Sequence, residues 1–308
     1  MNELIQVGLK TYYISGPFHV GIYITNENIT ADGQMNYDVC LIDSGLDMVV
    51  AKVIDKLLEE NHFNVSMIIN THYHADHTGG NDYFKKKYNC RIMSTKINAA
   101  LMSNYDICPA IVWGAAPIEE ILNNYFYATP CETTDIENEI IPEGISYFEL
   151  PGHCISHICV KTDDDVIFLG DAVVGKNTLI KNPITYIYDI GTYLNSLEQL
   201  KIIKAGLYIP YHAEPVKNIK KLVEANYQSV IGNMDKIKML CETPKSIDEL
   251  MSSFYNNEKI KLSLYKYAVE GGVIKTYVSY LHNKGELSAK NIDNYIKWQT
   301  VKNKKALQ

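Results

Sequence analysis

The sequence has 308 residues but only one arginine, Arg91. Arginine offers paired N–H donors that match the geometry of phosphate, so its scarcity argues against a nucleic-acid substrate. The seven cysteines are scattered, and none stands in a C-x-x-C pair. An odd number of isolated thiols is typical of reduced cysteines in a cytoplasmic protein rather than of a disulfide scaffold or a thiolate zinc site.

Long hydrophobic runs are also missing. The longest nearly uncharged apolar stretch, residues 107–118, is too short to cross a bilayer and contains two prolines and a glycine. The first residues lack the charged-then-apolar layout of a signal peptide, so we expect no export by that route, a cytoplasmic location and no membrane partner. With 46% hydrophobic and 21% charged residues, the composition is that of a globular protein with a substantial core.

Charge is unevenly distributed along the chain. Residues 1–216 hold 13 Lys and Arg against 27 Asp and Glu, a net −14, whereas residues 217–308 hold 16 Lys against 9 Asp and Glu, a net +7. This asymmetry predicts a domain boundary near residue 216. The basic segment could contact an acidic partner such as nucleic acid, pack against the acidic part of its own chain, or present a solvated lysine face.

Strand-like and helical patterns alternate up to about residue 216. Apolar runs followed by turn residues predict strands over 20–24, 37–42, 65–69, 145–150, 166–169 and 207–209. Apolar residues at helical spacing predict helices over 48–60, 81–88 and 194–205, and again beyond residue 216. The alternation predicts an α/β fold in which mixed sheets are covered by helices.

The segment 71–80, THYHADHTGG, carries the densest group of chemically active side chains. In an extended chain His72 and His74 point to the same side, so both imidazoles can enter one cavity. Asp76 and His77 follow where we expect the chain to turn, a turn that the Gly-Gly pair would permit. Imidazole and carboxylate together suit zinc, iron or manganese without any thiolate.

Three further ligand-type residues stand directly after predicted strands. They are His153, Asp171 and His212. Loops at one edge of a sheet can converge, and rigid strands then hold their side chains with the accuracy that a metal needs. Five histidines and two aspartates are enough for two adjacent metal ions. Their roles suggest one site of His72, His74 and His153, a second of Asp76, His77 and His212, and Asp171 bridging the two.

This order of residues resembles the metallo-β-lactamase fold superfamily of metallohydrolases, including its glyoxalase II-like members. The resemblance covers residues 1–216 and rests on the H-x-H-x-D-H element together with the three downstream ligands. It implies a four-layer αβ/βα sandwich with two metal ions at one edge between the sheets. It also implies the division of the seven ligands given above, which the residues alone suggest but do not assign.

Two positions near the predicted centre qualify the resemblance. Asp43 matches a family aspartate after an early strand, which implies that it orients a metal ligand, although an aspartate here could equally be a simple turn residue. At the last ligand many hydrolytic members carry Gly-His-Gly, whereas this chain has Tyr211, His212 and Ala213. The packing behind this ligand is therefore expected to differ from that of those members.

Two divalent ions in such a site predict hydrolysis. A water that bridges two metals loses its proton near neutral pH, because the metals lower its pKa to roughly 7. The hydroxide would attack a carbonyl or phosphoryl centre, and Asp76 is placed to orient the water and to carry a proton. We expect zinc, with iron or manganese as alternatives, and a small ester, thioester or lactone-like substrate.

An insertion of about 104–142 is predicted to cover the active site. Within it, residues 118–127 are predicted to be helix-like. Trp113 and the aromatic residues at 125–127 could form an apolar wall over the metals, or pack as core or as a dimer contact. The predicted substrate-pocket residues are Trp113, Tyr127 and Tyr211. An apolar cover would suit a small organic substrate better than a polyanion.

Residues 217–308 are predicted to form a small helical domain. Ser246 and Glu249 make a capping box, and later patterns predict helices over 262–268 and 273–281 and then a turn and a short strand at 285–287. This order is similar to the winged-helix-like C-terminal domain of some β-lactamase-like proteins, among them endoribonucleases. The resemblance implies a tail that shapes the active-site mouth, dimerises or contacts RNA.

Two other activities stay open on the sequence alone. An RNA phosphodiesterase is favoured by the basic tail and disfavoured by the shortage of arginine, and a mononuclear iron persulfide dioxygenase would not need Asp76, His77 and His212. An antibiotic lactamase fits less well, because such enzymes generally lack a carboxylate like Asp171 and are exported. The substrate, the metal and the choice between monomer and homodimer are left open.

Overall fold

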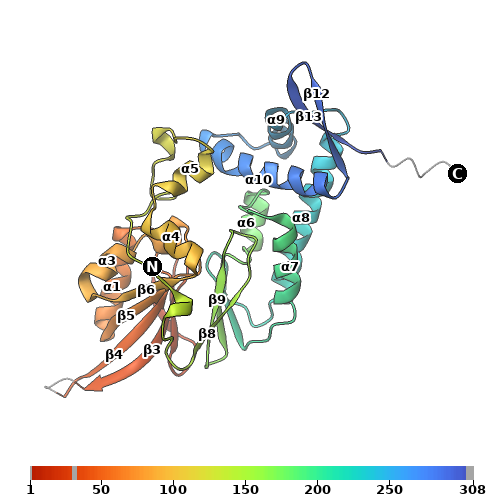
Figure 1. The fold of residues 1–308 in the computed structure, drawn as a ribbon. Coiled ribbons are helices and arrows are strands. Elements are labelled where there is room, and N and C mark those ends of the chain that lie inside the picture. Colours follow the sequence, from red (N-terminus) through yellow and green to blue (C-terminus); the bar gives the residue numbers. More distant parts are fainter. Residues whose placement is uncertain (1, 30–32, 303–308) are drawn as a thin grey trace.

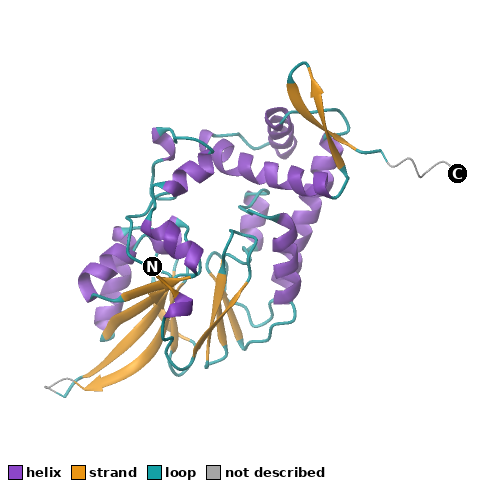
Figure 2. Ribbon diagram, in the orientation of Figure 1, coloured by secondary structure: helices purple, strands orange, loops and turns teal. Residues whose placement is uncertain are grey.

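A computed structural model describes residues 2–29 and 33–302. Within that part of the chain two mixed β-sheets face each other, and helices cover their outer faces (Figure 1). Figure 2 shows the two groups of strands side by side, with helices on either flank and further helices across one end. The predicted α/β sandwich is confirmed.

The first sheet has seven strands, and their order in the sheet follows their order in the sequence. Its first four strands are antiparallel, whereas the pairs from β4 onward are parallel. The strands are β1 (Glu3–Gln6), β2 (Thr11–Ser15), β3 (Val20–Ile29), β4 (Met35–Ile42), β5 (Phe63–Ile69), β6 (Arg91–Ser94) and β7 (Thr134–Asp135). The helices that follow its strands are α1 (Met48–Glu60), α2 (Ala75–Thr78), α3 (Asn81–Tyr88) and α4 (Lys96–Ser103).

The second sheet has four strands in the order β11-β10-β9-β8, with β10 and β11 parallel and the other pairs antiparallel. Its strands are β8 (Ile145–Glu149), β9 (Ile158–Thr162), β10 (Val166–Gly170) and β11 (Leu207–Pro210), and α6 (Lys176–Lys181) and α7 (Ile190–Leu200) connect the last two. Because β10 and β11 are parallel, side chains that follow their carboxyl ends reach the same edge of the sheet. That edge faces the loop after β5.

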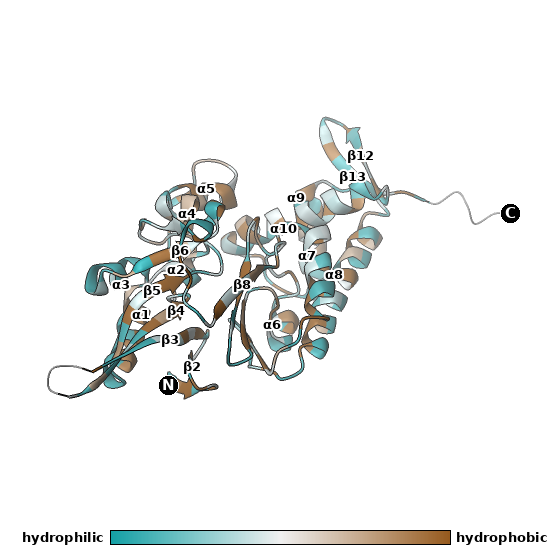
Figure 3. Ribbon diagram, turned by 60° about the horizontal axis from the view of Figure 1, so that its bottom comes forward, coloured by the Kyte–Doolittle hydropathy of each residue, from teal (hydrophilic) through white to brown (hydrophobic). Residues whose placement is uncertain are grey.

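Three apolar cores hold the layers together. A cluster between the sheets joins residues such as Ile42 and Ile69 of the first sheet to Val166 and Ile209 of the second. A second cluster packs α1 on the outer face of the first sheet, and the largest packs α7 and the C-terminal helices on the second. In Figure 3 the strands carry hydrophobic colour where layers meet, whereas the helices alternate hydrophobic and hydrophilic residues. Because hydrophobic residues recur on one side of each helix, each helix packs against its neighbours by that side.

Within the predicted insertion, the helix lies at residues 107–113 and not at the expected 118–127. A helix forms over α5 (Ile107–Trp113), and residues 118–127, predicted as helix-like, contain only the short 3-10 turn η1 (Glu119–Ile121). Pro109 lies in the first turn of α5, where its missing N–H has no helical partner to lose. Gly114 ends the helix with φ 80, a left-handed conformation that glycine adopts without strain. The 3-10 turn η2 (Ile136–Asn138) follows β7.

Three helices and a hairpin make up the C-terminal segment. They are α8 (Lys220–Leu240), α9 (Ile247–Glu258), α10 (Leu264–Asn283), β12 (Leu287–Ile292) and β13 (Tyr295–Thr300). The capping box at Ser246 is confirmed, since both of its hydrogen bonds are present. The two helices predicted over 262–281 are one continuous helix, α10, which passes between α5 and α8 in Figure 1.

The domain boundary at 216 and the winged-helix likeness stay predictions. No described helix is long and apolar enough to span a bilayer.

Asp55 of α1 predicts how stability depends on pH. Burial alone would raise the pKa of this carboxyl, but Lys87, Tyr88 and Tyr83 hydrogen-bond to it and hold the pKa below its ordinary value. The charged form therefore stabilises the fold above about pH 4, and this contribution is lost as the pH falls through the lowered pKa. We expect Asp55→Asn to reduce the free energy of unfolding at pH 7 and to flatten its decline below pH 4. Urea denaturation across pH 2.5–7 checks this, and parallel curves for the two proteins would contradict it.

Candidate metal centre

The loop after β5 positions four of the predicted ligand residues. His72 and His74 lie in its extended part, and His74 directly precedes α2, whose single turn carries Asp76 and His77. The backbone N–H of His77 donates to the carbonyl of His74 at 3.0 Å, which closes this turn. The short helix therefore sets the two later side chains against the two earlier ones.

Gly79 and Gly80 serve this loop for a reason other than the predicted one. Their φ angles are −62 and −86, so no left-handed turn requires glycine here. A Cβ on Gly79 would lie 1.8 Å from the carbonyl oxygen of Leu46, and one on Gly80 would lie 2.3 Å from that of Ser44. Glycine is needed because the loop after β4 passes directly against this backbone.

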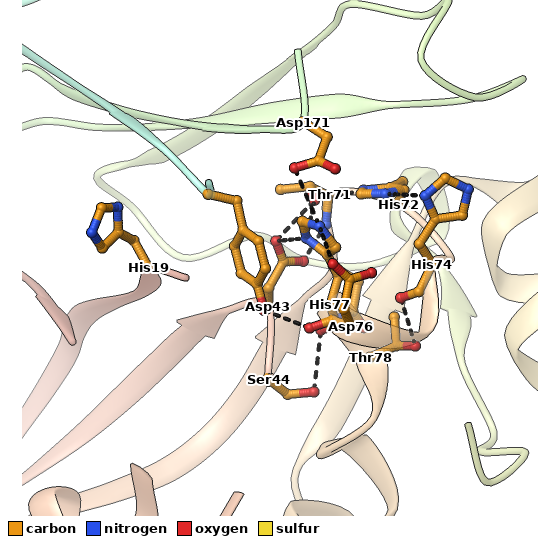
Figure 4. A network of polar contacts seen from close by, with 12 residues as sticks. His19, Asp43, Ser44, Thr71, His72, His74, Asp76, His77, Thr78 and Asp171 are labelled. Atoms are coloured by element: carbon orange, nitrogen blue, oxygen red, sulfur yellow. Dashed lines mark hydrogen bonds and ion pairs between the residues drawn. The ribbon is translucent and has the colours of Figure 1, made fainter. Parts of the chain in front are cut away.

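The second sheet supplies the other three residues. Asp171 follows β10, His212 follows β11, and His153 lies in the loop after β8. Figure 4 shows Asp171 approaching from this side while the side chains of the β5 loop approach from the other. All seven predicted ligand residues thus meet at one edge between the sheets.

Three imidazole nitrogens converge in what we call the tri-histidine group, made of His72, His74 and His153. Nδ1 of His74 lies 2.9 Å from Nε2 of His72 and 3.0 Å from Nε2 of His153. Their ligand atoms all lie within 4.8 Å of one another, close enough for one ion.

The mixed group, made of Asp76, His77 and His212, lies beside it. Nε2 of His212 is 3.0 Å from Oδ2 of Asp76, and Nε2 of His77 is 3.7 Å from the same oxygen. Asp171 stands between the groups: its Oδ1 is 3.4 Å from Nε2 of His77, and its Oδ2 is 3.5 Å from Nε2 of His153. One carboxylate can therefore reach both groups.

Asp43 hydrogen-bonds to Nδ1 of His77, the ring nitrogen that faces away from the metal centre. Its Oδ2 accepts a hydrogen bond from Nδ1–H of His77 at 2.8 Å, and its two oxygens also accept from the backbone N–H and hydroxyl of Thr71. With its proton on Nδ1, His77 presents the lone pair of Nε2 to the centre. Asp43 adopts φ 63, a left-handed conformation that aspartate tolerates better than most residues.

Two residues that the sequence analysis missed support the centre in the same way. The carbonyl of Tyr186 lies 3.1 Å from Nδ1 of His153, so that nitrogen donates and Nε2 is left with a lone pair. The buried His157 accepts the backbone N–H of Asp171 at its Nε2, at 3.0 Å. A histidine four residues after His153 and just before a strand was the available signal for His157. A carbonyl partner such as that of Tyr186 leaves no sequence signal.

The electrostatics differ between the two groups. Burial lowers the pKa of His72 well below its ordinary value, and burial together with His153 lowers that of His74 to about 3. Burial would also lower the pKa of His77, but Asp43, Asp76 and Asp171 raise it well above its ordinary value. The tri-histidine group is therefore neutral and offers lone pairs, whereas in the mixed group the carboxylates favour the charged form of His77.

The residues present fit a site for divalent metal ions. Nε2 of His77 and Oδ1 of Asp171 are buried, and within the described part of the chain neither makes a hydrogen bond. Buried acceptors of this kind are costly unless something satisfies them. Imidazole nitrogens and carboxylate oxygens are the donors that zinc, iron and manganese accept. Cys154 takes no part, because its thiol donates to the carbonyl of Ser156 and burial raises its pKa.

Two cavities adjoin the centre, and the three predicted pocket residues line neither of them. Tyr211 is buried, stacks on His77 with ring centroids 3.7 Å apart and donates its hydroxyl to the carbonyl of Asp76. Trp113 lines a separate cavity, and Tyr127 packs on Tyr105. As substrate-pocket residues these three stay a prediction, and from the same insertion Tyr125 and Phe126 line the first cavity.

A two-sheet sandwich with histidines and aspartates gathered at one edge defines a metal-dependent hydrolase. The chain belongs to the metallo-beta-lactamase superfamily, whose family model matches residues 38–212. That range includes all seven predicted ligand residues.

Known proteins resemble the chain at low identity. A hydroxyacylglutathione hydrolase of Prochlorococcus marinus (strain MIT 9312) is 25% identical over 252 residues, which is 80% of this chain and 88% of that protein. An atrochrysone carboxyl ACP thioesterase of Aspergillus fumigatus is 24% identical over 189 residues, 60% of this chain and 50% of that one. A beta-lactamase domain protein of Burkholderia ambifaria has the same fold, with a TM-score of 0.71, 16% identity and coverage of 97% of this chain and 94% of its own.

Asp43 offers a test of how the centre is supported. In an asparagine one of the two carboxylate oxygens is replaced by an NH2 donor, so either the backbone N–H of Thr71 or the Nδ1–H of His77 loses its acceptor, and the negative charge beside His77 is lost. We expect Asp43→Asn to weaken metal binding by about 10–100-fold, the range found for partners behind metal ligands. Competition with a chromogenic chelator measures this. If the variant binds metal as tightly as the parent, Asp43 is only a turn residue and does not orient His77.

Proposed function

We propose that this enzyme is a dinuclear thioester hydrolase, with His72, His74 and His153 holding one divalent ion, Asp76, His77 and His212 holding the other, and Asp171 bridging them. The observation that carries the proposal is the position of Asp171, whose two oxygens face one group each. If only the tri-histidine group bound an ion, Asp76, His77 and His212 would have no ion to bind. Zinc is the favoured metal, with iron or manganese as alternatives.

Asp76 and the two histidines beside it, His77 and His212, would have distinct roles in the reaction. When bound, the ions supply Lewis acidity and bring the pKa of water near 7. Asp76, whose side chain is 23% exposed, lines the cavity beside His74 and would orient the attacking water and carry its proton to the leaving group. His212 lies 3.0 Å from Oδ2 of Asp76 and, with His77, lowers the pKa of that carboxyl to about 2 against the effect of burial. Asp76 is thus held in its charged form.

The names of the relatives support the choice of substrate bond. Both the hydroxyacylglutathione hydrolase and the ACP thioesterase are named for action on thioesters. The predicted ester and lactone substrates have the same acyl carbon, so they belong to the panel that tests the proposal.

Four of the fourteen described lysines of the basic C-terminal segment are paired with carboxylates: Lys236 with Glu258, Lys238 with Asp235 and Glu286, Lys266 with Glu270, and Lys297 with Glu249. This pairing weighs against an RNA substrate. Paired lysines contribute little to phosphate binding, since the neighbouring carboxylates neutralise their charge. A mononuclear persulfide dioxygenase is disfavoured by the complete mixed group. We therefore propose residues 1–216 as the catalytic part and 217–308 as a segment that shapes the active-site mouth.

Metal analysis with a substrate panel tests the proposal. Protein purified under anaerobic conditions is expected to hold two metal ions per chain and to hydrolyse thioesters in a chelator-sensitive reaction. One iron per chain with oxygen uptake on a persulfide would favour the dioxygenase instead. Salt-sensitive cleavage of RNA that is lost on deleting 217–308 would favour the phosphodiesterase.

A further inference from the structure

Two cavities meet at the metal centre, and Tyr186, Tyr265 and Val269 line both of them. We call the first the aromatic pocket, with a volume of about 170 Å³ beside His74, and the second the polar pocket, with a volume of about 310 Å³ beside His212. Both are bordered by His153 and Asp171, so a substrate bound at the centre extends into both. Either volume is far beyond the roughly 10–15 Å³ that one water requires by this measure.

The aromatic pocket is built from segments far apart in the sequence. Val112 of α5 and Phe126 form one side, and Tyr265 and Val269 of α10 form another. The rings of Phe126 and Tyr265 lie 5.1 Å apart, so the insertion and the C-terminal helix meet over the pocket. No lysine or arginine is among its lining residues, and its charged groups are the carboxylates of the centre.

Tyr105, the most deeply buried tyrosine of this pocket, presents ring carbon rather than a free hydroxyl group. Its hydroxyl is bonded to the carbonyl of Tyr73 and to the hydroxyl of Thr78. Burial raises the pKa of Cys108 to about 12, so this thiol stays uncharged. A polar group in the aromatic pocket would therefore find few partners.

The polar pocket differs in the hydrophilic side chains that only it contains. Lys266, with 21% of its side chain exposed, lies 3.2 Å from Glu270 and 3.5 Å from the side-chain oxygen of Asn182. Thr178 and Thr185 add hydroxyl groups. An apolar group placed here would be buried against these polar groups without satisfying them, which is unfavourable.

We propose that the enzyme acts on thioesters with a bulky apolar acyl group, which lies in the aromatic pocket, while the polar thiol carrier lies in the polar pocket. This inference rests on the proposed function and adds the substrate class and its orientation. Phe126 and Tyr265 become specificity-determining residues. The C-terminal segment then contributes to substrate choice through α10.

A series of thioesters of one polar thiol, with acetyl, butyryl, hexanoyl and benzoyl groups, tests the acyl assignment. We expect kcat/KM to rise by about threefold to fourfold per added methylene until the pocket is full, because each buried methylene gains transfer free energy. Tyr265→Ala should abolish most of this preference. Tyr267→Ala is the matched control, since Tyr267 lies on the same helix, lines a separate cavity and bonds to Asp248. An acetyl preference, or equal effects of the two variants, would overturn the proposal.

A second series tests the orientation, with one acyl group and thiols that differ in polarity. Polar thiols should be preferred, and a preference for apolar thiols with small acyl groups would reverse the assignment and overturn it. Binding of the matching thioethers, which cannot be hydrolysed, is measured by calorimetry on the metal-loaded protein. If no thioester is cleaved, the proposed function fails, while the order of thioether affinities still decides the pocket assignment. Equal affinities for all the thioethers would refute the pocket assignment.

Discussion

Replacing His74 by alanine is expected to lower kcat/KM by at least about a thousandfold while the chain still folds. Nδ1 of His74 lies within 3.0 Å of the two other nitrogens of the tri-histidine group, so its removal opens one side of that site. Losing a bound ion removes several kcal/mol of transition-state stabilisation, and each 1.36 kcal/mol corresponds to about tenfold in rate. Steady-state kinetics on the preferred thioester and metal analysis of the same sample measure both effects.

His62→Asn is the matched control for His74→Ala. His62 is exposed, and its left-handed φ of 58 is one that asparagine also tolerates. It lies at the start of β5, whereas the metal centre follows the end of that strand. The control should keep full activity and two metal ions per chain. Full activity of His74→Ala, or equal loss in both variants, would refute the assignment of the centre.

Gly79→Ala is expected to destabilise the fold by about 3 kcal/mol, the upper range for overpacking in a rigid place. The added methyl would lie 1.8 Å from the carbonyl oxygen of Leu46, and this neighbour is backbone, which cannot rotate away. The loops after β4 and β5 would have to separate, although they carry Asp43 and the first four ligand residues. Urea denaturation gives the change in free energy of unfolding.

Gly232→Ala is the control for Gly79→Ala. Gly232 is an exposed residue in α8, and a Cβ there would meet nothing within 4 Å outside its own helix. Alanine favours a helix interior over glycine, so this variant should be more stable by about 0.5–1 kcal/mol. If Gly79→Ala is as stable as the parent, the close approach of the two loops is wrong.

Local patterns predicted six of the eleven strands described in the two sheets of the sandwich and missed β1, β2, β6, β7 and β9. Helix α1 was predicted to its bounds because its apolar residues repeat at helical spacing. The strands that lead to the centre were predicted from apolar runs closed by turn residues. The insertion was predicted less well: the segment that includes Phe126 has helical composition, yet it forms only a short 3-10 turn followed by loop. Phe126 in this segment packs against Tyr265, a residue that no local window contains.

By itself the sequence determined the α/β sandwich, the order of seven ligand-type residues after strand ends and the family to which they point. These follow from periodicity and residue chemistry, which act over a few neighbouring positions. Only the tertiary structure decided that His157 and Tyr186 support the centre, that Gly79 is needed for space rather than for a turn, and that α10 closes a pocket with the insertion. Each of these depends on contacts between segments far apart in the chain, and such contacts exist only once the layers have packed.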